Sequence, residues 1–201
     1  VSSDKTIVIY GDPKDPWRTD GRFFWMFERY GFQRVALLDG GLAGWKQAGK
    51  KIQRGRQLST LQSNLTIDNI NLNNQVIADK SLIKKVLLDK NFRIIDNRIR
   101  KEFDGTTPYG SPRGGHIPNA IHIHWPNFFQ TNGNLKTLPA LNSLLNKNGI
   151  RPDQEIIVYC TGGVRSAMAY FVFRYMGFKV RNYDGSWWDW SRSSFPIEVN
   201  G

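Results

Sequence analysis

Short apolar runs alternate along this chain with longer segments of helical spacing. Residues 92–96 and 155–159 are apolar and rich in β-branched side chains, which is typical of buried strands. Residues 81–90 have helical spacing before the first of these runs, and residues 166–176 form a helix-length apolar segment after the second. This alternation predicts an α/β fold in which helices cover both faces of a parallel sheet.

The pattern occurs twice. A strand, a helix and a strand ending in Asp-Gly can be read in residues 6–41 and again in residues 156–185. We therefore divide the chain into three parts, which are the C-terminal part of a first domain (1–53), a polar and asparagine-rich linker (54–75) and a second domain (76–201).

The first copy offers only part of a parallel sheet and leaves a strand edge exposed. The chain also starts with Val1 in place of an initiator methionine. From these two features we expect a longer protein, in which a missing N-terminal segment is a partner of the first copy.

The only cysteine, Cys160, directly follows the strand at 155–159. A lone cysteine is most often a small buried apolar side chain, but this one stands where the strand stops and glycine begins. Gly162 and Gly163 let backbone N–H groups turn inward, and the start of the next helix, with Ser166 as its predicted N-cap, adds partial positive charge. Such a loop binds anions, including a thiolate, a persulfide or thiosulfate. We interpret Cys160 as a reactive thiol.

The loop length separates two kinds of thiol chemistry. Arg165 follows Cys160 after four intervening residues. Phosphatases with a cysteine nucleophile leave one residue more, so that the guanidinium reaches the phosphate oxygens. The tighter loop favours a smaller group such as a sulfur atom.

At this point the chain resembles the rhodanese family of sulfurtransferases, over essentially all of residues 76–201. The resemblance rests on the order and spacing of the cysteine loop and of three further motifs, Ile94-Ile-Asp-Asn-Arg98 with Glu102-Phe103, Gly115-His-Ile-Pro-Asn-Ala120 and Asn182-Tyr-Asp-Gly-Ser-Trp187. It implies a rhodanese-like parallel α/β sheet preceded by a partial second copy of the same fold. In tandem members of the family, which act on thiosulfate or 3-mercaptopyruvate, an inactive first domain precedes a catalytic one. Gly11 stands where Cys160 stands in the second copy, and the prolines after it lack N–H groups, so the first copy should be silent.

The resemblance also implies roles for residues. Cys160 would be the catalytic nucleophile. The substrate-binding residues would be Thr161, Gly162, Gly163, Val164, Arg165, Ser166 and Arg113. The residues with a structural role near the site would be Asp96, Arg98, Glu102 and His116.

The expected reaction is a double displacement, in which Cys160 takes the outer sulfur of thiosulfate as a persulfide and passes it to cyanide or a thiol. Glu102 stands where the mercaptopyruvate branch of the family has an arginine, which favours thiosulfate as the donor. Thr161 and Gly162 are neutral where thiosulfate enzymes carry basic residues, so 3-mercaptopyruvate stays an alternative. Two further classes stay open, a cysteine-dependent phosphatase or arsenate reductase and a non-enzymatic rhodanese-like binding module.

Composition mainly constrains the partners. Lys and Arg number 28 against 17 Asp and Glu, a net charge of +11, which attracts small anionic substrates. The basic residues are scattered without interleaved aromatic side chains, so we expect no nucleic-acid partner. No apolar run has the length of a membrane span, and we expect no membrane partner. His122 and His124 share a strand face without a third ligand at metal spacing, so we expect no metal and no other cofactor. A single unpaired thiol favours the cytoplasm, with the periplasm as the alternative.

Overall fold

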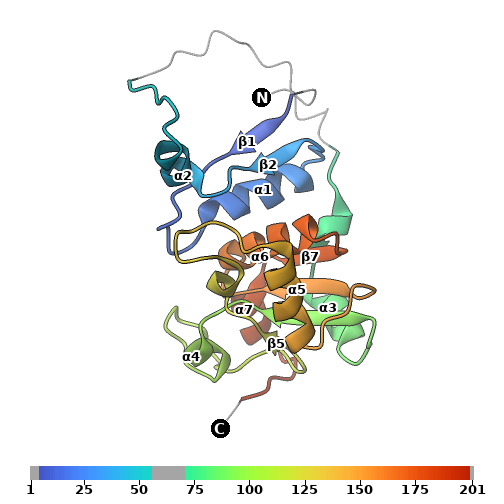
Figure 1. The fold of residues 1–201 in the computed structure, drawn as a ribbon. Helices are drawn as coiled ribbons and strands as arrows, with labels where there is room; N and C mark the ends of the chain where they lie inside the picture. The colour runs from blue at the N-terminus through green and yellow to red at the C-terminus, as the bar shows by residue number, and fades with distance from the viewer. Residues whose placement is uncertain (1–4, 56–70, 200–201) are drawn as a thin grey trace.

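The computed structural model describes residues 5–55 and 71–199, which form a larger and a smaller α/β part (Figure 1). In the larger part, five strands form one parallel sheet in the order β3-β7-β6-β4-β5. These strands are β3 (Ile77–Ala78), β4 (Phe92–Asp96), β5 (Ile121–His122), β6 (Glu155–Tyr159) and β7 (Val180–Tyr183). The predicted parallel α/β sheet is confirmed.

Helices cover both faces of this sheet. They are α3 (Lys80–Val86), α4 (Arg100–Phe103), α5 (Leu138–Lys147), α6 (Val164–Tyr175) and α7 (Ser186–Ser191), with the 3-10 turns η2 (Asn74–Val76) and η3 (Trp125–Phe128). Successive residues of β6 alternate between two apolar clusters. Ile156 and Val158 pack with α5 and α6, whereas Ile157 and Tyr159 pack with α3 and α7. All four are fully buried, so β6 is the centre of the core.

The smaller part contains β1 (Ile7–Ile9), α1 (Thr19–Arg29), β2 (Val35–Leu37) and α2 (Gly41–Gln47). Its two strands pair in parallel, and their order with the two helices is the same as that of β6, α6, β7 and α7. Helix α1 lies against α6 of the larger part (Figure 1). The contact is close because Gly21 faces Met168, where a Cβ on Gly21 would lie 2.5 Å from the Met168 Cα. Phe24 and Trp25 of α1 join the same apolar cluster as α6.

The helix that follows Cys160 starts earlier than the sequence predicts. Its N-cap is Gly163, with a φ of 80°, and the helix begins at Val164. The prediction that Ser166 is the N-cap is therefore wrong. Glycine adopts a positive φ without strain, so the chain turns at Gly163 and the helix starts at the next residue. Most of the predicted linker, residues 56–70, lies outside the described residues.

Candidate active site

Cys160 follows the last residue of β6 and is fixed by the start of α7. Its backbone N–H donates to Ser186 Oγ over 3.2 Å, and its carbonyl accepts from Trp187 N–H over 3.0 Å. Ser186 has a φ of 51°, which is rare for a residue with a side chain. Cys160 is only 1% exposed, so the sulfur is reached through a cavity and not from the open surface.

The backbone amides of the loop at 161–164 have no acceptor within the part of the chain that the structure describes. The loop carbonyls, in contrast, are engaged. Thr161 O accepts from Trp188 N–H over 3.0 Å, and Gly163 O accepts from Asn182 Nδ2 over 3.3 Å. Amides without a protein acceptor are available to an anion, and the start of α6 adds its dipole. This arrangement suits an anion next to the thiol, and residues 161–164 are called the cradle below.

Ser166 lies one turn into α6 and contacts the sulfur. Its Oγ is 3.6 Å from Cys160 Sγ and donates to Asn182 Oδ1 over 2.7 Å. The same Asn182 holds the Gly163 carbonyl through its other side-chain atom. Ser166 is fully buried, so its hydroxyl and Asn182 connect the thiol to the cradle without water from the surface.

Arg165 and Glu102 form a buried ion pair beside the cradle. The guanidinium of Arg165 donates to both carboxylate oxygens of Glu102, over 2.7 and 2.9 Å. Thr161 Oγ1 donates to the same carboxylate over 2.5 Å. Burial raises the pKa of Glu102, but the hydrogen bonds and charge of Arg165 outweigh it and hold that pKa below its usual value. Burial lowers the pKa of Arg165, whereas Glu102 and the charge of the Cys160 thiolate raise it, and the net direction is upward.

A cavity of about 360 Å³ opens onto Cys160. It is lined by Trp17, Thr19, Tyr109, Cys160, Thr161, Gly162, Val164, Arg165 and Trp188. Two of these residues, Trp17 and Thr19, come from the smaller part of the molecule. The rings of Trp17 and Tyr109 meet edge to face at 5.5 Å, and the Arg165 guanidinium lies 5.3 Å from one and 5.6 Å from the other.

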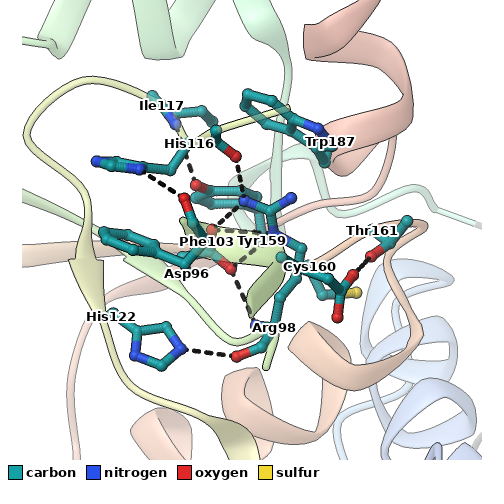
Figure 2. A network of polar contacts seen from close by, with 12 residues as sticks. Asp96, Arg98, Phe103, His116, Ile117, His122, Tyr159, Cys160, Thr161 and Trp187 are labelled. Carbon is teal, nitrogen blue, oxygen red and sulfur yellow. Dashed lines mark hydrogen bonds and ion pairs between the residues drawn. The ribbon is translucent and has the colours of Figure 1, made fainter. Parts of the chain in front are cut away.

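A second polar network lies behind Cys160 and holds the strand ends together (Figure 2). Arg98 pairs with Asp96 over 2.6 Å and donates to the Gly115 carbonyl over 2.7 Å. Burial lowers the pKa of Arg98, but Asp96 outweighs this and raises it. His116 stacks on Phe103 at 3.6 Å and bonds its carbonyl over 2.9 Å. The network thus connects the residues that follow β4 with the turn at Gly115 and His116.

Arg113 lies near the end of α7. Its guanidinium donates to four backbone carbonyls at the end of α7, those of Trp190, Ser191, Ser193 and Phe195. It does not line the cavity at Cys160. Arg113 therefore caps the end of α7 and lies outside the lining of the Cys160 cavity, and its role in binding the substrate stays a prediction.

Comparison with known proteins agrees with this geometry. Residues 80–193 match the family model of the rhodanese-like domain. The chain belongs to the rhodanese family. It is 31% identical to a thiosulfate sulfurtransferase of Corynebacterium glutamicum over 209 residues, which cover 99% of this chain and 68% of that protein. It is 30% identical to a sulfur carrier protein of Thermus thermophilus over 208 residues, 94% of this chain and 69% of that protein.

The rhodanese relatives are longer than this chain. A putative thiosulfate sulfurtransferase of Synechococcus elongatus is 31% identical, and the match covers 99% of this chain but 63% of that protein. Among solved structures, an anaerobic ergothioneine biosynthesis enzyme from Chlorobium limicola superposes with a TM-score of 0.84 at 22% identity, over all of this chain and 52% of that one. At this identity the likeness shows the fold alone.

Residues 5–55 and 71–199 contain neither a three-ligand metal site nor a helix that could span a membrane. No group of three or more His, Cys, Asp or Glu side chains is arranged to hold a metal ion in this part of the chain. None of the helices described there is both long and apolar enough to cross a membrane.

Proposed function

We propose that this rhodanese-family chain is a sulfurtransferase that moves sulfane sulfur from thiosulfate to cyanide or a thiol through a persulfide on Cys160. The observation that carries the proposal is the position of Cys160 on a cavity, next to loop amides that have no acceptor among the described residues. Relatives named thiosulfate sulfurtransferase and sulfur carrier protein support it.

The proposed first step is attack by the Cys160 thiolate on the outer sulfur of thiosulfate. The sulfur–sulfur bond of the donor breaks, sulfite leaves with the bonding electron pair, and Cys160 carries a persulfide anion. In the second step the acceptor attacks the terminal sulfur and the thiolate of Cys160 is restored. The amides of residues 161–164 stabilise the anionic sulfur in this proposal, and the Ser166 hydroxyl becomes a further donor when its single proton turns from Asn182 Oδ1 to the sulfur.

The charge of Arg165 is shared with Glu102, so the amides carry most of the anion binding in this proposal. Arg165 orients the loop and faces the cavity between two aromatic rings. A carboxylate-bearing donor such as 3-mercaptopyruvate needs a cation to bind its carboxylate. The cation that lines this cavity, Arg165, is already paired with Glu102. This favours thiosulfate, with 3-mercaptopyruvate as the alternative donor.

We further propose that residues 1–53 are the C-terminal part of an inactive rhodanese-like domain. The loop after β1 has Gly11 in place of a cysteine, and amides of this loop are already occupied by its own carboxylates. Lys14 N–H donates to Asp12, and the N–H groups of Trp17 and Thr19 donate to Asp15, each over 2.9 Å. These amides are not free to cradle an anion.

The completing partner we propose for the first copy is an N-terminal segment of the same protein. The proposed compartment is the cytoplasm, where one unpaired thiol stays reduced.

The test compares turnover of thiosulfate, 3-mercaptopyruvate and an aryl phosphate by the same preparation, with cyanide or a thiol as sulfur acceptor. Thiosulfate should be turned over fastest, and Cys160→Ser should abolish sulfur transfer. Activity retained in Cys160→Ser would sink the proposal, and hydrolysis of the aryl phosphate without sulfur transfer would replace it with phosphatase chemistry.

A further inference from the structure

An arginine of the first copy contacts the loop of the second. Arg22, on α1, donates from Nη1 to the Gly163 carbonyl over 3.4 Å and pairs through the same nitrogen with Asp184 Oδ1. Its guanidinium also lies 4.8 Å from the Trp25 ring. The side chain is only 25% exposed, so this contact is partly shielded from water. Arg22 thus joins the first copy to the N-cap residue of α6.

The contact acts on one peptide group of the cradle. The Gly163 carbonyl is held from outside by Arg22 and by Asn182 Nδ2. The surroundings of Gly163 are tight, since a Cβ there would lie 2.5 Å from Asp184 Oδ1 and 3.0 Å from Arg22 Nη1. In a planar trans peptide the N–H points opposite to the carbonyl. Holding the carbonyl of Gly163 therefore fixes the direction of the Val164 N–H.

We propose that Arg22 is a positioning residue for sulfur transfer, through which the silent first copy orients the Val164 amide of the anion cradle. The inference rests on the proposed function, in which the amides stabilise the thiolate and the persulfide. Donors fixed in advance stabilise an anion more than donors that must reorient. Arg165 does not replace them, because Glu102 shares its charge.

A purely structural role, in which Arg22 merely holds the two copies together, predicts a different outcome. The chain offers a matched control for this. Arg174 of α6 pairs with Glu28 of α1 over 3.1 Å, so it joins the same two helices through an ion pair. Its guanidinium donates to Glu28 from two nitrogens, away from the loop at residues 160–166. A variant of Arg174 weakens the junction and leaves the cradle untouched.

The experiment uses the full chain and compares Arg22→Met with Arg174→Met. Two rates are measured at neutral pH, alkylation of Cys160 by iodoacetamide and single-turnover loading of sulfur from saturating thiosulfate. Since Cys160 is the only cysteine, the alkylation is specific to it. In Arg22→Met the Val164 N–H should point less well at the anion, and both rates should fall about tenfold. This is a smaller effect than complete loss of one hydrogen-bond donor would have. Both rates should stay within about twofold of wild type in Arg174→Met, and Arg22→Lys should recover part of the loss, because it keeps a cationic donor.

Equal rates in Arg22→Met and wild type would overturn the inference, and so would an equal loss in Arg174→Met. If Arg22→Met does not fold, Asp184→Asn decides in its place, because it removes the negative charge that pairs with Arg22 and keeps the length of the side chain. A loss in that variant supports the inference and unchanged rates overturn it. A wild-type protein that alkylates but never loads sulfur counts against the proposed function, and the alkylation rates still decide the role of Arg22.

Discussion

Glu102 and Arg165 are separated by 63 positions in sequence, yet both are nearly fully buried and share two hydrogen bonds beside the thiol. Removing one charge of a buried ion pair leaves the other charge buried without a partner. The resulting loss of stability is larger than the net contribution of the intact pair to stability. Glu102→Gln should therefore lower the free energy of unfolding by about 3 kcal/mol at neutral pH. Asp153→Asn, which breaks an exposed pair with Arg151, is the control and should change it little. Urea unfolding measures both, and equal losses would contradict the role given to the buried pair.

The cost of Glu102→Gln should depend on pH. Burial raises the pKa of Glu102, but the hydrogen bonds and charge of Arg165 outweigh burial and lower it from an ordinary value of 4.5 in the folded protein. A carboxylate with a lowered folded pKa stabilises the fold above its unfolded pKa, and this stabilisation is lost as pH falls through the folded pKa. Urea unfolding should thus show a constant difference between wild type and variant above about pH 5 that shrinks below it. A difference independent of pH down to unfolding would refute this.

Local sequence predicted part of the site residue by residue. Cys160 at a strand end and the Asp96–Arg98 pair follow from neighbours a few positions away. The backbone contacts of Arg113 could not be predicted, because sequence does not show that its guanidinium meets four carbonyls of a segment 77 or more positions later. Arg22 and Trp17 were missed for the same reason, since only the packing of α1 on α6 brings them to the loop.

Among the elements, the junction of α1 and α6 depends on Gly21. A methyl group there would lie 2.5 Å from the Met168 Cα, and backbone cannot yield as a side chain can. Gly21→Ala should therefore destabilise the protein by about 1–2 kcal/mol, because overpacking outweighs the gain in helix propensity. The control is Gly44→Ala in α2, where the nearest atom is Asp39 O at 3.2 Å. Thermal unfolding should show a loss for the first variant and no loss for the second, and equal values would show that the junction tolerates a methyl group.

Element boundaries show where sequence reasoning stops. The position of β6 was readable from its apolar run, because a strand buried on both faces is apolar throughout. The start of α6 was not, because a serine is the commoner N-cap and only the backbone shows that Gly163 takes a positive φ. The shift matters chemically, since it moves Val164 to the first helical position and makes its amide part of the cradle.

In the molecule as a whole, the two copies share one cavity. Trp17 of the first copy closes the wall beside Arg165. Trp17→Ala should admit water, weaken the interaction between the amides and the anionic sulfur, and lower kcat/KM for thiosulfate about fivefold. Trp45→Ala is the matched control, because Trp45 is also 40% exposed and in the first copy but lines a different cavity. Steady-state kinetics of both variants measure this, and equal values for the two would show that Trp17 has no special role.

The architecture was predictable only in outline. Periodicity indicated the parallel sheet with helices on both faces, and the repeated motifs indicated two copies of one order. The joint cavity was not predictable, because it depends on how α1 packs across α6, and no local pattern encodes that angle. Sequence already indicated that the chemistry belongs to the second copy, because Gly11 replaces the cysteine in the first. Only the structure suggests what the first copy contributes, which is a cavity wall at Trp17 and a contact from Arg22 to the loop.

The central claim is that Cys160 carries sulfur as a persulfide, and intact mass spectrometry detects this persulfide without an acceptor assay. After incubation with thiosulfate and removal of excess donor, the wild-type chain should gain the mass of one sulfur atom and lose it again when cyanide is added. Cys160→Ser should gain none. No gain in the wild type, or the same gain in Cys160→Ser, would show that Cys160 does not carry the sulfur.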